Sequence, residues 1–205
     1  MCAPFSYYSP ILLFSHSRCM KPSLVIAGLG NPGSSYERTR HNVGFQAADV
    51  LAAACGKSPW REHQKFQALV QEARIVTVPV LLVKPLTYMN RSGESLRKIM
   101  DFYKLTAAQQ LLVLCDDIDL PLGTVRLRRL GGPGTHNGLK SVVEQFGEGF
   151  VRLRIGLGVP PAGSDLAAWV LSVPPLPEQE ELTRVLQSLP ETVRSFVLDD
   201  AGAEG

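Results

Sequence analysis

Short apolar runs alternate along the chain with longer segments in which apolar residues recur every three or four positions. The runs predict buried strands, and the periodic segments predict helices packed on them. Strands are expected at residues 23–27, 66–72, 74–77, 80–83, 111–115, 124–129 and 151–157. Helices are expected at residues 43–54, 92–103, 136–146 and 164–170, and from residue 177 onward. This alternation predicts an α/β fold: a single domain with a twisted mixed β-sheet flanked by helices on both faces.

Four features modify this pattern locally. Pro79 has no backbone donor, so a hairpin or an irregular edge is expected there, and the stretch Gly56–Gln64 is expected to be a loop. Ser92 is a candidate N-cap for the helix that follows it. Pro190 is expected to kink or restart the last helix.

The α/β domain is predicted to cover residues 21–198. Residues 1–20 contain one Arg and no acidic residue, with an apolar patch too short for a secretory signal. We therefore expect residues 1–20 to be a disordered N-terminal extension, with Met20 as the native start. Residues 199–205 are expected to form a flexible tail.

Composition and charge narrow the class of protein. Hydrophobic residues make up 45% and charged residues 20%, as in ordinary globular domains. The four cysteines form no C-x-x-C pair, so neither a disulfide framework nor a zinc site is expected. We therefore expect a cytoplasmic location. No apolar run reaches the roughly 18 residues that a membrane span requires.

The net charge of +2 is unevenly distributed. Residues 161–205 carry two arginines against eight acidic residues, a net charge of −6, which leaves +8 for residues 1–160. A basic body is compatible with a polyanionic partner, although charge alone does not decide this.

The densest motif is G-L-G-N-P-G at residues 28–33, followed by Tyr36 and by T-R-H-N at residues 39–42. It lies between the first predicted strand and the first predicted helix. Asn31 and His41 are therefore expected in a loop at the carboxyl end of a strand, where open α/β sheets bind ligands.

The same glycines also fit the dinucleotide fingerprint G-x-G-x-x-G, with Asp49 about 20 residues from the first glycine. Asp49 falls inside a predicted helix rather than at the end of a second strand, where a ribose would be held. The Asn-Pro pair between the glycines is also a poor start for a helix that must offer N–H groups to a pyrophosphate. The dinucleotide interpretation is therefore the weaker one.

Three further blocks follow predicted strands or glycine-rich turns. They are K-P-L-T-Y-M-N at residues 84–90, D-D-I-D-L-P at 116–121 and G-G-P-G-T-H-N-G-L-K at 131–140. A sheet rich in parallel strands would bring their polar residues to one rim.

In this order and at this spacing, the four blocks resemble the bacterial-type peptidyl-tRNA hydrolase family over residues 21–198. The resemblance implies a monomeric enzyme that hydrolyses the ester bond of peptidyl-tRNA without a metal or cofactor, releasing free tRNA and peptide. It implies that His41 is the general base that activates water and that Asp116 holds its ring. The substrate and tRNA contacts that it implies are Asn31, Tyr36, Met89, Asn90, His136, Asn137, Arg128 and Arg154.

Basic residues on two predicted strands and one helix form a candidate phosphate track. They are Arg126, Arg128, Lys140, Arg152 and Arg154. The resemblance points to Arg128 and Arg154 as the clamp on a tRNA phosphate, whereas Arg126 and Arg152 are expected on a solvent-exposed face of the sheet.

Two positions depart from the family pattern. Cys115 stands where the family usually has His, and Thr135 replaces a glycine in the loop before His136. Cys115 ends a buried apolar run and no motif activates it, so it is not expected to be a nucleophile.

Other enzyme classes lack their motifs here: the chain contains no G-x-S-x-G, no P-loop and no H-E-x-x-H. The open alternative is a non-catalytic relative that acts as an RNA-splicing or protein adaptor. An adaptor should expose a large apolar patch on the C-terminal helix. The outer positions of that helix are polar in the sequence: Glu178, Gln179, Glu181, Arg184 and Gln187.

Overall fold

The computed structural model describes residues 21–202, with side chains described as far as residue 199, and these residues form one seven-stranded mixed sheet. In chain order the strands are β1 (Leu24–Gly28), β2 (Arg61–His63), β3 (Ala68–Ile75), β4 (Val78–Pro85), β5 (Leu111–Asp117), β6 (Val125–Arg128) and β7 (Val151–Gly156). Their order across the sheet is β2-β3-β4-β1-β5-β7-β6. Strands β4, β1, β5 and β7 run parallel, and β3 and β6 run antiparallel to their neighbours.

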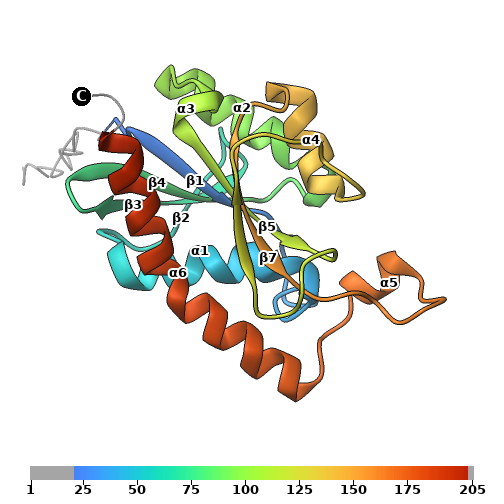
Figure 1. Ribbon diagram of the computed structural model, residues 1–205. Coiled ribbons are helices and arrows are strands. Elements are labelled where there is room, and N and C mark those ends of the chain that lie inside the picture. Colours follow the sequence, from blue (N-terminus) through green and yellow to red (C-terminus); the bar gives the residue numbers. More distant parts are fainter. Residues whose placement is uncertain (1–20, 203–205) are drawn as a thin grey trace, which may run out of the picture.

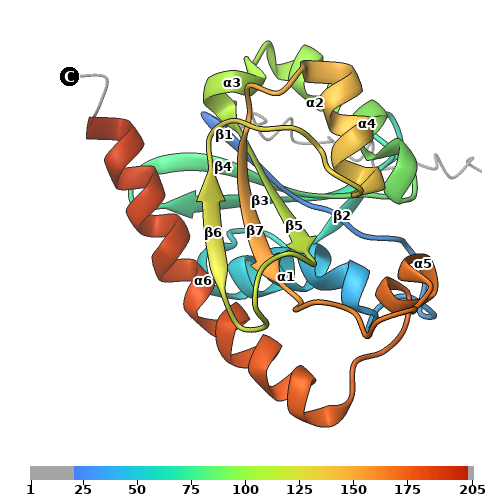
Figure 2. The same ribbon diagram turned by 45° about the vertical axis from the view of Figure 1, so that its right-hand side comes forward.

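Helices cover both faces of this sheet (Figure 1). They are α1 (Val43–Cys55), α2 (Ser92–Tyr103), α3 (Ala107–Gln110), α4 (Asn137–Phe146), α5 (Leu166–Val170) and α6 (Leu176–Gly202), with 3-10 helices η1 (Arg40–Asn42) and η2 (Met89–Arg91). Helices α1 and α6 pack on one face, and α2 and α4 on the other (Figure 2). The predicted fold class, an α/β domain with a mixed sheet flanked on both faces, is confirmed.

The two central strands explain why both faces must be covered. Every residue of β1 and of β5 is buried. Alternate side chains point to opposite faces, so Ile26 joins the core under α1 and α6 while Val25 joins the core under α2 and α4. Continuous apolar runs of this kind are typical of parallel strands buried on both sides.

The hairpin expected near Pro79 is present, but it turns before the proline. Residues 66–72 and 74–77, predicted as separate strands, belong largely to the single strand β3, whose Ile75 pairs with Val78 across the turn. Pro79 lies inside β4, where its carbonyl oxygen accepts a hydrogen bond from the Ser23 N–H at 2.8 Å. Proline has no N–H to donate, but it keeps its carbonyl acceptor. That acceptor is used here, so the strand tolerates the proline.

Other local expectations were wrong. The stretch 56–64 contains the edge strand β2, which is short, charged and too brief to show a period. Ser92 is the first residue of α2 rather than its N-cap, and its hydroxyl donates to the Met89 carbonyl oxygen at 3.0 Å. Helix α6 does not restart at Pro190: it continues as one helix, with Leu189 and Val193 in the core on both sides of the proline.

The structure tests the predicted domain limits only in part. Residues 1–20 and 203–205 lie outside the described residues. Helix α6 runs to Gly202, so positions 199–202, assigned above to a tail, are helical. Between residues 21 and 202, no helix combines the length and the apolar character needed to cross a lipid bilayer.

Gly44 brings the start of α1 against the ends of the two central strands. A Cβ atom at this position would overlap the carbonyl oxygens of Leu29 and Leu114, which are backbone atoms and cannot rotate away. Because η1 directly precedes α1, the same close approach fixes where η1 lies relative to β1 and β5.

The substitution Gly44→Ala tests this packing. We expect the free energy of unfolding to fall by about 1–3 kcal/mol or more, as for other overpacked sites, despite the higher helix propensity of Ala. Urea unfolding measures it. Gly149→Ala is the matched control, because its added Cβ would meet only the Ala108 side chain at an ordinary 3.9 Å. Equal stabilities of the two variants would contradict the packing argument.

Candidate active site

His41 lies in η1, between the loop after β1 and helix α1, and its neighbour Asn42 fastens this turn. The Asn42 side-chain oxygen accepts from the Asn31 N–H at 2.8 Å, and its amide nitrogen donates to the Asn31 carbonyl oxygen at 2.9 Å. The Asn42 side chain thus makes the two hydrogen bonds to the Asn31 backbone that a neighbouring strand would make in a sheet. The contiguous sequence around His41 therefore sets the position of the buried imidazole.

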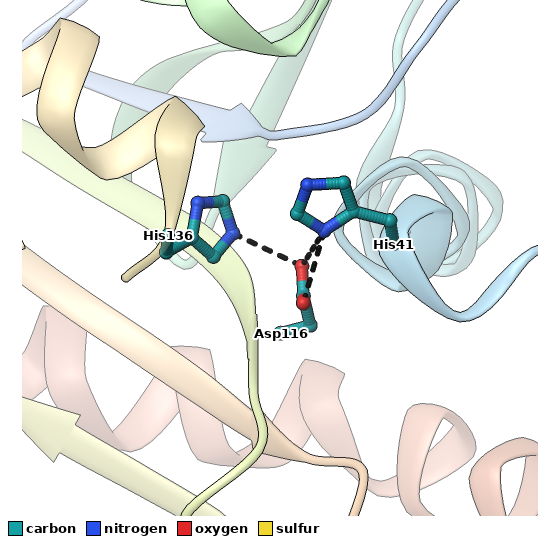
Figure 3. Close-up of side chains that lie close together, drawn as sticks. All are labelled: His41, Asp116 and His136. Carbon is teal, nitrogen blue, oxygen red and sulfur yellow. Dashed lines mark hydrogen bonds and ion pairs between the residues drawn. The ribbon is translucent and has the colours of Figure 1, made fainter. Parts of the chain in front are cut away.

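Asp116, near the end of β5, is shared by two histidines (Figure 3). His41 Nδ1 lies 2.9 Å and 3.0 Å from the two carboxylate oxygens, and His136 Nε2 lies 3.0 Å from Oδ1. The Asp116 carboxylate is only 4% exposed. The sequence predicted that Asp116 holds His41, but it gave no sign that His136 contacts the same carboxylate.

The hydrogen-bond partners assign the tautomers of both rings. His136 is the N-cap of α4, and its Nδ1 accepts from the Leu139 N–H at 3.2 Å. Nδ1 therefore carries no proton, so Nε2 carries it and donates to Asp116. His41 turns Nδ1 to the carboxylate, and a donor is required there too. The His41 Nε2 is consequently left with its lone pair, which is the form a general base needs.

The two histidines reverse the effect of burial on Asp116. Burial alone would raise the pKa of a carboxyl group, because the charged form loses its water. Electrostatic attraction to His136 and His41 and the hydrogen bonds that these rings donate outweigh burial and hold the pKa of Asp116 well below its ordinary value. The group is therefore a carboxylate at neutral pH and can orient one imidazole and stabilise its protonated form.

His41, Asp116 and His136 also form, among the residues that the structure describes, a group whose ligand atoms lie within 4.8 Å of one another and could hold a metal ion. A metal on His136 Nε2 would require the proton on Nδ1, and the hydrogen bond that Nδ1 accepts from Leu139 would be lost. The hydrogen-bond pattern therefore suits a proton-bridged cluster better than a metal site.

A second group of residues lies on the other side of Asn31. The Asn31 side-chain oxygen accepts from the Met89 N–H at 2.9 Å, which ties η2 to the loop after β1. Just before η2, Tyr88 has a φ of 60° and is 54% exposed, and its ring meets Tyr36 edge-on at 6.5 Å. A non-glycine residue in this conformation is strained, and such strain clusters at functional sites.

Gly138, the second residue of α4, lets these two groups meet. A Cβ atom here would overlap the Met89 sulfur and crowd the rings and methyls of His136 and Leu29. The missing side chain therefore allows α4, η2 and the loop after β1 to approach one another.

A cavity of about 260 Å³ opens beside the histidines. Its wall includes His41, Asp116, His136, Asn137, Arg154 and, from α5, Leu166 and Val170. Five of the residues predicted for the site thus line one cavity. Asn31 and Met89 are buried and are not part of this wall, and Asn31 lines a different cavity. Tyr36 is half-buried, and Asn90 is exposed on η2.

Arg128 and Arg154, predicted together as a phosphate clamp, have different surroundings. Arg128 is exposed on β6 and is not part of the cavity wall. Arg154 is half-buried: it donates to the Asp117 carboxylate at 3.0 Å and to the Gly132 carbonyl oxygen at 3.2 Å. Its guanidinium therefore links the end of β5 to the glycine-rich loop that leads to His136.

Arg152 was expected on a solvent-exposed face of the sheet, and that expectation was wrong. Its side chain is fully buried, lies 4.0 Å from the centre of the Phe150 ring and donates to the carbonyl oxygens of Glu148 and Phe150. β7 is an interior strand, so alternation with Arg154 did not imply exposure. Arg126, on the edge strand β6, is exposed as expected.

Sequence reasoning missed four contributors to the site. Asn42 and Arg40 were noted only as neighbours of His41, and their adjacency to it was the available signal. Asp117 stood in the same acidic run as Asp116. The apolar residues of α5 carried no signal, because a five-residue helix is too short to reveal which side it turns to a cavity.

Comparison with known proteins decides the family. The model of the family described as peptidyl-tRNA hydrolase matches residues 25–204. The chain belongs to the peptidyl-tRNA hydrolase family.

Relatives within the peptidyl-tRNA hydrolase family are similar over most of this chain. It is 45% identical to the chloroplastic peptidyl-tRNA hydrolase of Arabidopsis thaliana over 85% of its own length and 60% of that protein's. It is 41% identical to the Listeria welshimeri peptidyl-tRNA hydrolase, over 84% of its own length and 92% of that protein's. The crystal structure of the Acinetobacter baumannii peptidyl-tRNA hydrolase superposes with a TM-score of 0.82 at 35% identity, covering 90% of this chain and 93% of that one.

Cys115, expected where the family usually has His, is fully buried, so its thiol has no access to a substrate. Burial, helped by the neighbouring charge of Asp116, raises the pKa of its thiol far above the ordinary value. A thiol that stays protonated neither attacks an ester nor competes with His41 for the proton.

The lowered pKa of Asp116 predicts how stability changes with pH. The folded pKa lies below the ordinary 3.8, so the carboxylate contributes stability above that pH and loses it as the pH falls toward the folded value. We expect the difference in unfolding free energy between the wild type and Asp116→Asn to shrink below about pH 4, by up to about 1.4 kcal/mol for each pH unit. Urea unfolding from pH 6 to pH 2 measures it. A difference that stays constant over this range would refute the coupling.

Proposed function

We propose that the protein hydrolyses the ester bond between the peptide and the ribose of peptidyl-tRNA, releasing free tRNA and peptide. One observation carries the proposal: a buried carboxylate orients an imidazole whose other nitrogen bears a lone pair and lies beside an open cavity. Membership of the family supports the choice of substrate.

The geometry supports the following reaction. His41 Nε2 takes a proton from a water molecule while the water oxygen attacks the ester carbonyl carbon, giving a tetrahedral intermediate and an imidazolium. Asp116 stabilises that imidazolium. When the intermediate collapses, the bond to the ribose oxygen breaks, and His41 returns its proton to that oxygen. Peptide carboxylic acid and tRNA hydroxyl are the products, so one water is consumed and the base is regenerated.

Neutral amides are the proposed contacts for the peptide. Asn31, Asn90 and Asn137 each carry a donor and an acceptor without adding charge. The Asn31 oxygen is used by Met89, so its NH₂ group is the one that can donate to a substrate oxygen. A site that binds an acyl carbonyl also favours peptidyl-tRNA over aminoacyl-tRNA, whose free amine lacks that carbonyl.

His136, Tyr36 and Met89 are proposed to complete the substrate contacts. His136 lies in the cavity wall, but both of its ring nitrogens have partners within the protein, so its contact with substrate would be through the ring. Tyr36 lies in the same loop as Asn31, and Met89, at the start of η2, donates its N–H to the Asn31 side chain.

Arg128 and Arg154 are proposed to contact tRNA phosphates. Arg128 supports this as an exposed cation on the edge strand. Arg154 lines the cavity, and its ion pair with Asp117 would have to share the guanidinium with a phosphate. Contact with phosphates rather than bases suits a protein that must accept many tRNAs.

We further propose a monomer acting in the cytoplasm, without a metal or cofactor. The adaptor alternative is supported less well, because the exposed positions along the middle of α6 are polar: Glu180, Thr183, Arg184, Gln187 and Ser188.

The hydrolysis proposal is tested with N-acetyl-aminoacyl-tRNA as substrate. We expect His41→Ala and Asp116→Ala each to lower kcat by roughly 10²–10⁴-fold, the usual contribution of a positioned general base. His63→Ala is the matched control, because His63 lies on the distant edge strand β2, and its kcat should equal the wild type's. Full activity in His41→Ala would remove His41 as the base. Equal rates for the free aminoacyl-tRNA would remove the selectivity.

The phosphate proposal is tested by the dependence of tRNA affinity on salt. We expect Arg128→Gln to weaken binding for all elongator tRNAs alike and to reduce the slope of log K against log salt by about 1. Arg194→Gln on α6, another exposed arginine, which pairs with Glu191, serves as the control and should leave the slope unchanged. The clamp would be wrong if both variants keep the wild-type slope.

A further inference from the structure

Arg40, the residue before His41, is buried and makes three contacts with one distant segment. Its Nη1 donates to the Ser172 hydroxyl at 2.6 Å, and its Nη2 donates to the Glu178 carboxylate at 2.7 Å. The guanidinium lies 4.6 Å from the centre of the Trp169 ring. The arginine side chain is 6% exposed, so these contacts are largely withdrawn from water.

The partners of Arg40 belong to residues 165–178, which we term the cover segment. It comprises Asp165, which caps α5, then α5 itself, the following turn and the first residues of α6. Leu166, Ala167 and Val170 of this segment form part of the cavity wall beside His41 and Asp116. Figure 1 shows α5 set apart from the sheet and its covering helices.

Packing holds the cover segment mainly at the half-buried Trp169, which contacts the core under α1 and α6. Pro174 is its only buried residue, and the others are exposed or half-buried. A short helix with little buried apolar area opens easily unless specific bonds hold it. The three side-chain contacts of Arg40, with the bond from its backbone N–H to the Ser172 carbonyl oxygen at 3.1 Å, supply such bonds.

We infer that Arg40 is a positioning residue that latches the cover segment over the active site, and that the latch sets substrate affinity rather than the chemical step. The inference rests on the proposed function. Arg40 touches neither the imidazole of His41 nor the carboxylate of Asp116 in any hydrogen bond described, so its side chain acts through the cover segment.

The expected change in KM follows from the populations of the latched and unlatched conformations. When a binding-competent conformation is only partly populated, the apparent dissociation constant rises in inverse proportion to its population. An unlatched cover segment must be closed by the substrate, so KM rises. Once the complex has formed, His41 and Asp116 have their usual geometry, so kcat changes little.

Lysine cannot replace this arginine fully. The planar guanidinium donates to two partners in fixed directions and stacks on an indole at the same time, whereas an ammonium is a single compact charge. Arg40→Lys should keep the attraction to Glu178 and lose the bond to Ser172 and the stacking on Trp169. Its effect should therefore lie between the wild type and Arg40→Ala.

The test compares Arg40→Ala, Arg40→Lys and Arg38→Ala. Arg38 is the matched control. It lies two residues before Arg40 and donates to Gln179 of α6 at 2.8 Å, but on the exposed surface. With N-acetyl-aminoacyl-tRNA, we expect KM to rise about tenfold in Arg40→Ala, as for a lost hydrogen bond to a charged group, and less in Arg40→Lys. We expect kcat within twofold of the wild type, an unshifted pH profile of kcat, and no change in Arg38→Ala.

A second measurement needs no substrate. Hydrogen exchange of the amides of Trp169 and Leu171, which donate to Asp165 and Ala167, should speed up in Arg40→Ala and not in Arg38→Ala. If the wild type fails to hydrolyse the substrate, the proposed function fails, while exchange still reports on the latch.

The latch is refuted if Arg40→Ala keeps the wild-type KM and exchange rates, or if it lowers kcat with KM unchanged. Should Arg40→Ala not fold, Ser172→Ala and Glu178→Ala each remove one contact at the more exposed partner. Each should then raise KM and α5 exchange in the same direction, and wild-type values in both would equally refute the latch.

Discussion

A buried carboxylate that two imidazoles must share holds this site together. A carboxylate removed from water is costly unless hydrogen bonds replace the lost solvent, and Asp116 receives them from His41 and His136. The end of β5, the turn η1 and the start of α4 must therefore meet at one point. A fold that displaced any one of them would leave either a buried charge without its partners or a helix without its cap.

Close backbone packing makes that meeting feasible. Gly44 lets α1 reach the ends of β1 and β5, and Gly138 lets α4 reach η2 and the loop after β1. Asn42 then replaces a strand neighbour for Asn31, so the loop behaves as an extension of the sheet. The groups around the cavity are fixed in advance, and a preorganised site loses little free energy in orienting its groups during the reaction.

The sequence predicted the parts of the fold that repeat and missed the parts that depend on distant partners. The period of α2 gave its limits at Ser92 and Tyr103, since four apolar residues on one stripe leave little ambiguity. The strand β2 has three polar or charged residues and no period at all. The alternation of apolar and basic residues in β7 led to the wrong position for Arg152. The pattern shows which residues share a face of the strand, but not what covers that face. The contact of His136 with Asp116 and those of Arg40 with Ser172 and Glu178 join residues 20, 132 and 138 positions apart, and no local pattern encodes them.

The burial of Arg152 has a consequence for encounters with a polyanion. Its guanidinium donates to the carbonyl oxygens of Glu148 and Phe150, and burial, with repulsion from Arg154, lowers its pKa from the usual value. Arginine nevertheless remains a cation in proteins. A buried cation still contributes to the potential at the nearby surface, so Arg152 adds to the positive field of Arg126 and Arg128 on the neighbouring strand β6. A polyanion that approaches this edge of the sheet is therefore attracted by a charge that lies beneath the surface.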